Sequence, residues 1–157
     1  MDNQNLNTPQ VISLRPAAVF AFLKVFPLIL CTLGFLFLAW WIYPVFIWFS
    51  LLTLAMAIYR FTYIRRISYW VTPEFVRISR GIFFKRTDQV ELFRVKDYIL
   101  TQSFLLQVFC LMDLELRSTD PVNPVIWLRG IPHSNLVDTI REHVQEGRQH
   151  NRIYEIN

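Results

Sequence analysis

An uncharged run of 35 residues, from position 25 to position 59, constrains the fold of this chain more than any other feature. A bilayer core is about 30 Å thick, and a helix needs about 20 apolar residues to cross it. The run is therefore too long for one crossing at ordinary tilt and suits two short ones. Pro44 lies near its midpoint, and proline disfavours helix at the preceding residue and lacks a backbone N–H. We therefore expect two membrane-spanning helices, residues 24–42 and 45–63, joined by a tight turn.

The charges that flank this run predict its orientation. Arg15 and Lys24 precede it, Arg60, Arg65 and Arg66 follow it, and the turn between the helices carries no charge. Basic residues concentrate on the cytoplasmic side of membrane helices. We therefore expect a multi-pass protein of the bacterial inner membrane with both termini in the cytoplasm, anchored at that interface by the three arginines.

Three aromatic residues beside the turn, Trp40, Trp41 and Tyr43, suit the opposite interface, because their apolar rings carry a polar edge. Two other arrangements stay open: a hairpin buried in a soluble protein, and a re-entrant hairpin that enters the bilayer without crossing it. The first is disfavoured because a domain this small cannot cover two helices that are apolar on every face. A cleaved signal peptide is disfavoured because the run starts late and lacks a small-residue cleavage motif.

Charge is unevenly distributed after the hairpin. Residues 60–96 carry nine Lys or Arg against three Asp or Glu, whereas residues 97–157 carry five against eight. Two explanations fit the basic excess: the orientation rule alone, or attraction to anionic lipid head groups at about 1 kcal/mol for each basic residue near the surface. We interpret Cys31 and Cys110 as small buried apolar residues, and a cytoplasmic location argues against a disulfide between them.

Short segments with an alternating pattern follow the hairpin and predict antiparallel strands. In residues 75–80, for example, Phe75, Arg77 and Ser79 fall on one face and the intervening residues fall on the other. Gly81 can adopt the left-handed backbone that the following turn needs. We expect about six or seven strands, among residues 68–71, 75–80, 90–93, 98–101, 105–109, 111–117 and 125–128.

Apolar residues at helical spacing predict one amphipathic helix near the C-terminus. They are Leu136, Val137, Ile140 and Val144; Ser134 or Asn135 suits the N-cap and Gly147 the C-cap. The chain therefore divides into a cytoplasmic segment (1–23), the helical hairpin (24–63), a folded domain (64–147) and a polar tail (148–157). An antiparallel sheet with one terminal helix is an α+β arrangement.

Four stretches of the domain carry family motifs: Ser68-Tyr69-Trp70-Val71-Thr72, residues 75–81, residues 87–97, and Leu128-Arg129-Gly130-Ile131 before the terminal helix. In this order, after a pair of membrane helices, they resemble the membrane-anchored bacterial pleckstrin-homology-like (PH-like) domain family. The resemblance covers about residues 20–146. It implies a curled antiparallel sheet of about seven strands, capped by the C-terminal helix. The chain departs from the family pattern at Phe109-Cys110-Leu111-Met112, where family members often carry glycines.

Residue patterns typical of enzymes are missing from the sequence. Its four glycines are too far apart to form a phosphate-cradling loop, and neither HExxH nor CxxC occurs. We interpret His133, His143 and His150 as solvated rather than metal-binding, and Asp113 and Glu115 as the polar face of a strand rather than an acid–base pair. We therefore expect no enzyme activity, cofactor, metal or small-molecule substrate, and no nucleic acid binding, since no motif accompanies the basic residues.

The remaining class is a binding protein, for which the first hypothesis is an adaptor. In this hypothesis the cytoplasmic PH-like domain binds a protein partner, or another copy of itself, at the membrane surface, and an exposed sheet edge accepts the partner by strand addition. A small membrane pore or effector subunit is a further alternative. It is disfavoured because the hairpin holds no ionisable residue between positions 25 and 59.

The second hypothesis is a module that senses anionic membrane lipids. Its candidate lipid- or partner-binding residues surround the turn after Gly81: Arg77, Arg80, Phe83, Phe84, Lys85 and Arg86. The basic side chains would pair with phosphate, and the two phenylalanines would insert into the membrane interface. The alternative for Phe83 and Phe84 is that they are core residues merely flanked by charge.

Overall fold

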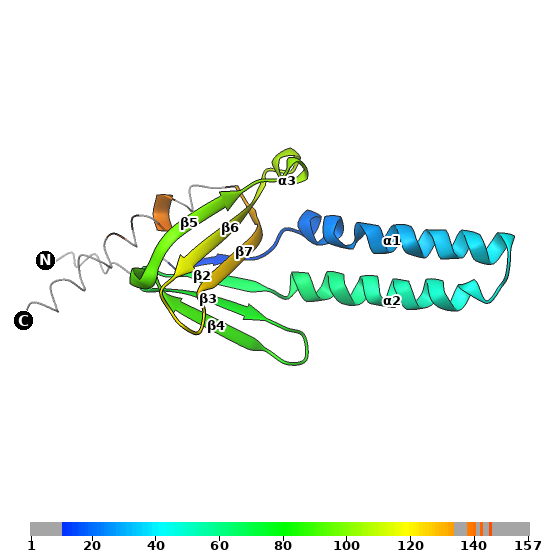
Figure 1. Ribbon diagram of the computed structural model, residues 1–157, viewed down its shortest axis with the longest axis horizontal. Helices are drawn as coiled ribbons and strands as arrows, with labels where there is room; N and C mark the ends of the chain where they lie inside the picture. Colours follow the sequence, from blue (N-terminus) through cyan, green and yellow to red (C-terminus); the bar gives the residue numbers. More distant parts are fainter. Residues whose placement is uncertain (1–10, 134–137, 141, 143–144, 146–157) are drawn as a thin grey trace, which may run out of the picture.

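The computed structural model describes residues 11–133, 138–140, 142 and 145, and it shows a long helical hairpin projecting from a β-rich domain (Figure 1). The hairpin consists of α1 (Ala18–Trp41) and α2 (Phe46–Arg65), with Pro44 in the turn between them. Both helices are long and apolar enough to cross a membrane, and most of their side chains are exposed. The two predicted helices and the turn at Pro44 are confirmed, and their crossing of a membrane stays a prediction.

Helix α1 begins at Ala18, earlier than the expected residue 24. Phe20, Ala21 and Val25 are its buried residues, so its first turns have an apolar side that packs against the neighbouring parts of the molecule. Lys24 lies between these residues and is exposed, so a charge interrupts the sequence without interrupting the helix. The limits of the uncharged run therefore did not mark the start of α1.

One polar contact joins the two helices. The Ser50 hydroxyl donates a hydrogen bond to the Thr32 carbonyl at 3.2 Å. The Thr32 hydroxyl itself donates to the Leu28 carbonyl of its own helix at 2.8 Å. Polar groups with such partners are compatible with an apolar surrounding, because their hydrogen-bonding capacity is used within the hairpin.

In the described part of the chain, seven antiparallel strands form two sheets. Sheet A has the order β1-β2-β3-β4, and sheet B has the order β5-β6-β7. Their bounds are β1 Ile12–Leu14, β2 Ser68–Val71, β3 Phe75–Arg80, β4 Arg86–Glu91, β5 Val95–Thr101, β6 Leu111–Ser118 and β7 Val125–Pro132. A 3₁₀ turn, η1 (Leu92–Arg94), connects the sheets. The α+β class is confirmed, with the strands divided between two sheets.

The core consists of apolar side chains contributed by both sheets. Val76 and Ile78 of β3 and Leu114 and Leu116 of β6 are each at most 1% exposed and belong to one cluster. The alternation predicted for β3 is confirmed, since Val76 and Ile78 are buried and the residues between them are not. Burial of such side chains is the main favourable term for a fold of this size.

The terminal helix is described in part. Residues 138–140, 142 and 145 are helical, and Ile140 is 1% exposed within the core cluster. This agrees with the prediction that the apolar side of the helix covers the sheet. The other predicted contact and cap residues lie outside the described part of the chain: Ser134, Asn135, Leu136, Val137, Val144 and Gly147.

Three element predictions are wrong. The strand expected over residues 90–93 ends at Glu91, and the two residues after it belong to η1. Residues 105–109 were expected to form a strand, but Phe104–Val108 forms a short helix, α3. Strand β1 was not expected at all; it precedes the hairpin and pairs with β2, with Ile12 opposite Val71. The interpretation of Cys31 and Cys110 as buried residues is also wrong, because both are exposed and Cys110 occupies a turn with φ of 50°.

The hairpin is fixed to the domain through Gly130 of β7. Phe20 of α1 is buried with Leu106 and Leu111. It packs so closely on Gly130 that a Cβ atom added to Gly130 would lie 2.2 Å from the Phe20 Cγ. The Ala17 N–H donates to the Gly130 carbonyl at 2.8 Å. Gly130 has φ of +64°, a conformation that glycine adopts without steric penalty. Close approach and backbone conformation both require glycine here.

Candidate binding site at the base of the helical hairpin

The turn between β3 and β4 presents two bare aromatic side chains. Phe83 is 85% exposed and Phe84 is 93% exposed, so the interpretation of these residues as core is wrong. Gly81 opens the turn with φ of +119°, as its predicted role requires. Figure 1 shows that this turn points to the side of the domain from which the hairpin projects.

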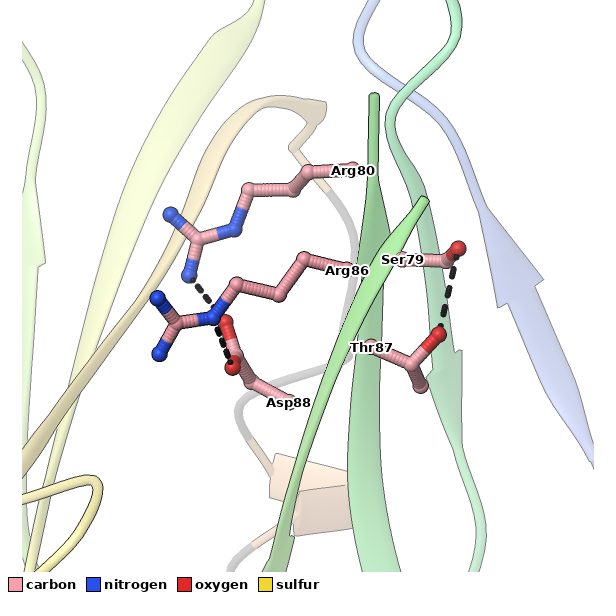
Figure 2. Close-up of polar contacts among 5 residues, drawn as sticks. All are labelled: Ser79, Arg80, Arg86, Thr87 and Asp88. Atoms are coloured by element: carbon pink, nitrogen blue, oxygen red, sulfur yellow. Dashed lines mark hydrogen bonds and ion pairs between the residues drawn. The ribbon is translucent and has the colours of Figure 1, made fainter. Parts of the chain in front are cut away.

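Two arginines of this β-hairpin converge on one carboxylate (Figure 2). Arg80 Nη2 lies 2.9 Å from Asp88 Oδ2, and Arg86 Nε lies 2.8 Å from Asp88 Oδ1. The Asp88 side chain is 8% exposed, whereas those of Arg80 and Arg86 are 45% and 76% exposed. Because two cations share a single anion, this cluster keeps a net positive charge next to the aromatic turn.

Arg77 lies on the opposite face of β3 and is not part of this cluster. Its Nε and Nη2 donate to Gln89 Oε1 at 3.2 and 2.9 Å, and its guanidinium lies 4.9 Å from the Phe75 ring centroid. Successive residues of a strand point to opposite faces, so Arg77 and Arg80 cannot contact the same small ligand. The predicted binding residues are therefore not one patch.

Further basic residues gather around the base of the hairpin. Lys85 lines a cavity of about 450 Å³ together with Arg15, Arg65 and Arg66, and none of the residues that line it is acidic. Arg65 is the last residue of α2, and its Nη1 donates to the Pro16 carbonyl at 3.2 Å. Arg65 therefore contributes both positive charge and a link between the two ends of the hairpin.

We define the basic cluster as the nine Lys and Arg residues that line this cavity or two others, one of which shares lining residues with each of the remaining two. Asp88 is the one carboxylate among the described residues that line them. The members are Arg15, Lys24, Arg60, Arg65, Arg66, Arg80, Lys85, Arg86 and Arg129. Outside this cluster, Arg94 and Arg117 are paired with carboxylates, those of Glu91 and Glu115. The basic excess seen in the sequence is thus concentrated at one end.

The predicted aromatic anchors lie at the far tip of the hairpin. Trp40 and Trp41 close α1 and are 90% and 76% exposed, and Tyr43 in the turn is 66% exposed. The predicted basic anchors Arg60, Arg65 and Arg66 are at the other end of the helices, within and just after the last turns of α2. The two kinds of anchor are therefore separated by the length of the hairpin.

Sequence reasoning missed a second apolar tip. In and next to α3, Phe104 is 77% exposed, Leu105 53%, Val108 60% and Phe109 45%. Figure 1 places α3 on the same side of the domain as the hairpin. These apolar residues are one and four positions apart, which is a helical spacing. The segment is too short for this spacing to distinguish a helix from a strand.

The polar groups that suggested chemistry have structural partners. Asp113 Oδ1 accepts a hydrogen bond from the Gly130 N–H at 2.7 Å, and Glu115 pairs with Arg117 at 2.9 Å. Within the described residues, no three His, Cys, Asp or Glu side chains are placed to hold a metal ion. His133 is exposed, and the other two histidines lie outside the described residues.

The buried hydroxyl of Tyr69 lies beside the basic cluster. Burial raises the pKa of its hydroxyl above the usual value of 10.0, because the phenolate would lose its hydration. The hydroxyl accepts from the Arg129 N–H at 3.1 Å and lies 3.4 Å from the Arg129 carbonyl, to which it donates. Tyr69 thus connects sheet A to sheet B beside the basic cluster.

Comparison with known families identifies the class of protein. The model of the bacterial PH domain family matches residues 18–148, which include the hairpin, the strands of both sheets from β2 onward and the terminal helix region. The chain belongs to the bacterial PH domain family, and the resemblance seen in its motifs is confirmed. Domains of this kind are typically binding modules rather than catalysts, and no enzyme family is indicated. Neither the curated proteins nor the solved structures contain a significant match.

Proposed function

We propose that this protein is a non-enzymatic adaptor of the bacterial inner membrane. The hairpin anchors the chain with both termini in the cytoplasm, and the PH domain binds a protein partner at the membrane surface. The observation that carries the proposal is the exposed edge of sheet B. Among the described strands β5 pairs with β6 alone, and six of its seven residues are exposed. Such an edge offers backbone groups to an added strand.

The side chains of β5 favour this role. Tyr98, Ile99 and Leu100 are 38%, 37% and 42% exposed, which leaves apolar surface on both sides of the strand. Natural proteins usually block free edges with charge or proline. In β5 the charged residues Lys96 and Asp97 are confined to its beginning, so the second half of the edge is open to an apolar partner strand.

The experiment uses the full-length protein in mild detergent and identifies what co-purifies with it. Ile99→Lys places a charge on the proposed edge, and Val125→Lys places the same charge on β7, the other edge strand of sheet B, where Val125 is 42% exposed. A stoichiometric partner that is lost with Ile99→Lys and kept with Val125→Lys supports the proposal. Loss with both variants, or with neither, contradicts strand addition at β5. A second copy of the chain as the captured partner would assign the edge to self-association.

A second candidate function is contact with anionic lipid, favoured by the exposure of Phe83 and Phe84 beside Lys85 and Arg86. An aromatic tip flanked by cations suits the membrane interface, where rings enter the head-group region and cations meet phosphate. The exposed side chains of α3 would reach the same surface, since both tips point to the side from which the hairpin projects (Figure 1). In this arrangement the domain rests on the bilayer at two points beside its anchor.

The test measures the depth of the aromatic turn in lipid nanodiscs. A nitroxide is attached at Phe84→Cys in a background with Cys31→Ser and Cys110→Ser, because both native thiols are exposed. Contact predicts that the label collides with oxygen more often than with a water-soluble nickel complex when the disc contains anionic lipid. The charge reversals Lys85→Glu and Arg86→Glu should return the label to water. A label in water with every lipid composition refutes this candidate.

A further inference from the structure

A cavity of about 510 Å³ lies where the hairpin meets the two sheets. Its wall comes from four parts of the fold: Phe20 of α1, Ile64 of α2, Ile78 of sheet A and Trp127 of sheet B are among its lining residues. Because α1 is held to β7 by Phe20 and Gly130, the cavity is built from elements whose relative positions are fixed.

Four cations surround this cavity, and none of the described residues that line it is acidic. The cations are Lys24, Arg60, Arg80 and Arg129. Arg80 shares Asp88 with Arg86, but none of the other three has a carboxylate partner within the described part of the chain. Lys24 Nζ lies 5.6 Å from the Phe20 ring centroid, and the Arg129 guanidinium lies 4.7 Å from that of Trp127. Aromatic faces thus hold two of the cations without neutralising them.

The rest of the wall is apolar. Phe20, Ile64, Ile67 and Trp127 lie alongside the cations. A small inorganic anion would use the charges only. A phospholipid would use both parts of the wall, since its phosphate is joined directly to a glycerol and acyl chains. The position also fits a lipid, because Lys24 and Arg60 belong to the ends of the two apolar helices nearest the domain.

We propose that this cavity binds the phosphate group of an anionic phospholipid, which enters from the membrane between the hairpin and the sheets. The inference rests on the proposed anchoring of the hairpin in the membrane. Arginine suits the role because its planar guanidinium pairs with two phosphate oxygens at once, and basic pockets on the cytoplasmic side of membrane helices favour such head groups. A bound phosphate would be contacted from the hairpin by Arg60 and from sheet B by Arg129.

The experiment compares three forms of the full-length protein. They are the wild type, the cavity variant Arg60→Gln/Arg129→Gln, and the control variant Arg77→Gln/Arg94→Gln. The control removes the same two charges from side chains that line none of the three cavities. Each protein is released from nanodiscs of equal phosphatidylglycerol and phosphatidylcholine, and native mass spectrometry measures the retained lipid. Circular dichroism checks folding, and Lys24→Gln, at an exposed position, serves as a milder cavity variant.

The wild type and the control should retain phosphatidylglycerol in preference to phosphatidylcholine, and the cavity variant should lose about tenfold or more of that preference, since each charge-assisted contact contributes at least a factor of that order. Equal retention by all three proteins would overturn the proposal, as would equal loss in the control. A separate titration of lipid-free protein with inorganic phosphate, followed by tryptophan fluorescence, separates the sources of phosphate. Saturable phosphate binding in the wild type without lipid retention would assign the site to a soluble phosphate.

Failure of the membrane proposal gives a different result. If the hairpin does not anchor the chain, the protein leaves the membrane fraction in an alkaline carbonate wash, whatever the cavity binds. If the hairpin anchors the chain and the cavity is empty, the protein stays in the membrane fraction and no lipid preference depends on Arg60 or Arg129. Partner capture at β5 depends on neither outcome.

Discussion

Replacing Gly130 by alanine tests the joint between the hairpin and the domain. The new Cβ would lie 2.2 Å from Cγ, 2.4 Å from Cδ1 and 2.7 Å from Cβ of Phe20. Rotation of the Phe20 side chain about χ1 would move Cγ and Cδ1 but would leave Cβ at 2.7 Å, so a change of rotamer alone cannot clear the clash. The Phe20 ring, now 5% exposed, has to leave its site.

The magnitude follows from two losses. A buried phenylalanine that becomes exposed loses about 1.5–3 kcal/mol of transfer free energy. Alanine at φ of +64° adds about 1–2 kcal/mol of backbone strain, because its Cβ crowds the following carbonyl. We therefore expect Gly130→Ala to lower the free energy of unfolding by about 2.5–5 kcal/mol. The hydrogen bond from Ala17 to Gly130 is at risk as well.

The assay is a double-mutant cycle on the full-length protein in detergent, with unfolding followed by circular dichroism. Phe20→Ala removes the ring atoms but keeps a Cβ, so it relieves most of the clash and none of the backbone strain. Gly130→Ala should therefore be less harmful in the Phe20→Ala background by at least about 1 kcal/mol. Gly34→Ala is the matched control, because nothing lies within 4 Å of its added Cβ, and we expect it to be neutral or stabilising. Equal losses from Gly130→Ala in both backgrounds would refute the steric argument.

Two further predictions concern the polar groups beside the basic cluster. Asp88→Asn keeps the shape of a nearly buried side chain but removes the anion shared by two arginines. The denaturation midpoint should therefore fall by an amount equivalent to about 1–2 kcal/mol. An unchanged midpoint would mean that the ion pairs of Asp88 with these exposed arginines contribute little to stability. Burial raises the pKa of Tyr69, so the folded state holds this proton more tightly than the unfolded state, and its contribution to stability is constant below about pH 10 and falls above it. Thermal unfolding between pH 8 and 11 should show a smaller alkaline loss in Tyr69→Phe than in the wild type, and equal losses would show that another group is responsible.

The parts of the fold that sequence could predict are those with local causes. The hairpin follows from a long uncharged run interrupted by Pro44, and the buried face of β3 follows from alternation within six residues. Strand β1 has only three residues, and its partner β2 lies beyond the whole hairpin, so no local pattern marks it. In residues 104–109 an almost continuous apolar run fits a strand or a helix equally well, so its pattern does not distinguish the two.

The candidate site divides in the same way. Alternation already placed Arg77 and Arg80 on opposite faces of β3, and the structure confirms this separation. Exposure of Phe83 and Phe84 could not be predicted, because an apolar pair next to a turn is equally compatible with the core. The cavity cations come from α1, α2, β3 and β7, so their convergence depends on tertiary structure alone.

The pairing of β1 with β2 also constrains the order in which parts of the protein can fold. The chain emerges from the ribosome as β1, then both apolar helices, then β2, yet β1 and β2 are neighbours in sheet A. Residues 12–14 therefore have no partner until the hairpin and its connecting residues, 15–67, have been synthesised. Sheet A cannot form completely until the hairpin has brought β2 back beside β1. Formation of the hairpin and completion of sheet A therefore become consecutive steps of folding. In a chain whose hairpin does not form, β1 has no β2 beside it to pair with. A complete sheet A therefore requires that the hairpin has formed.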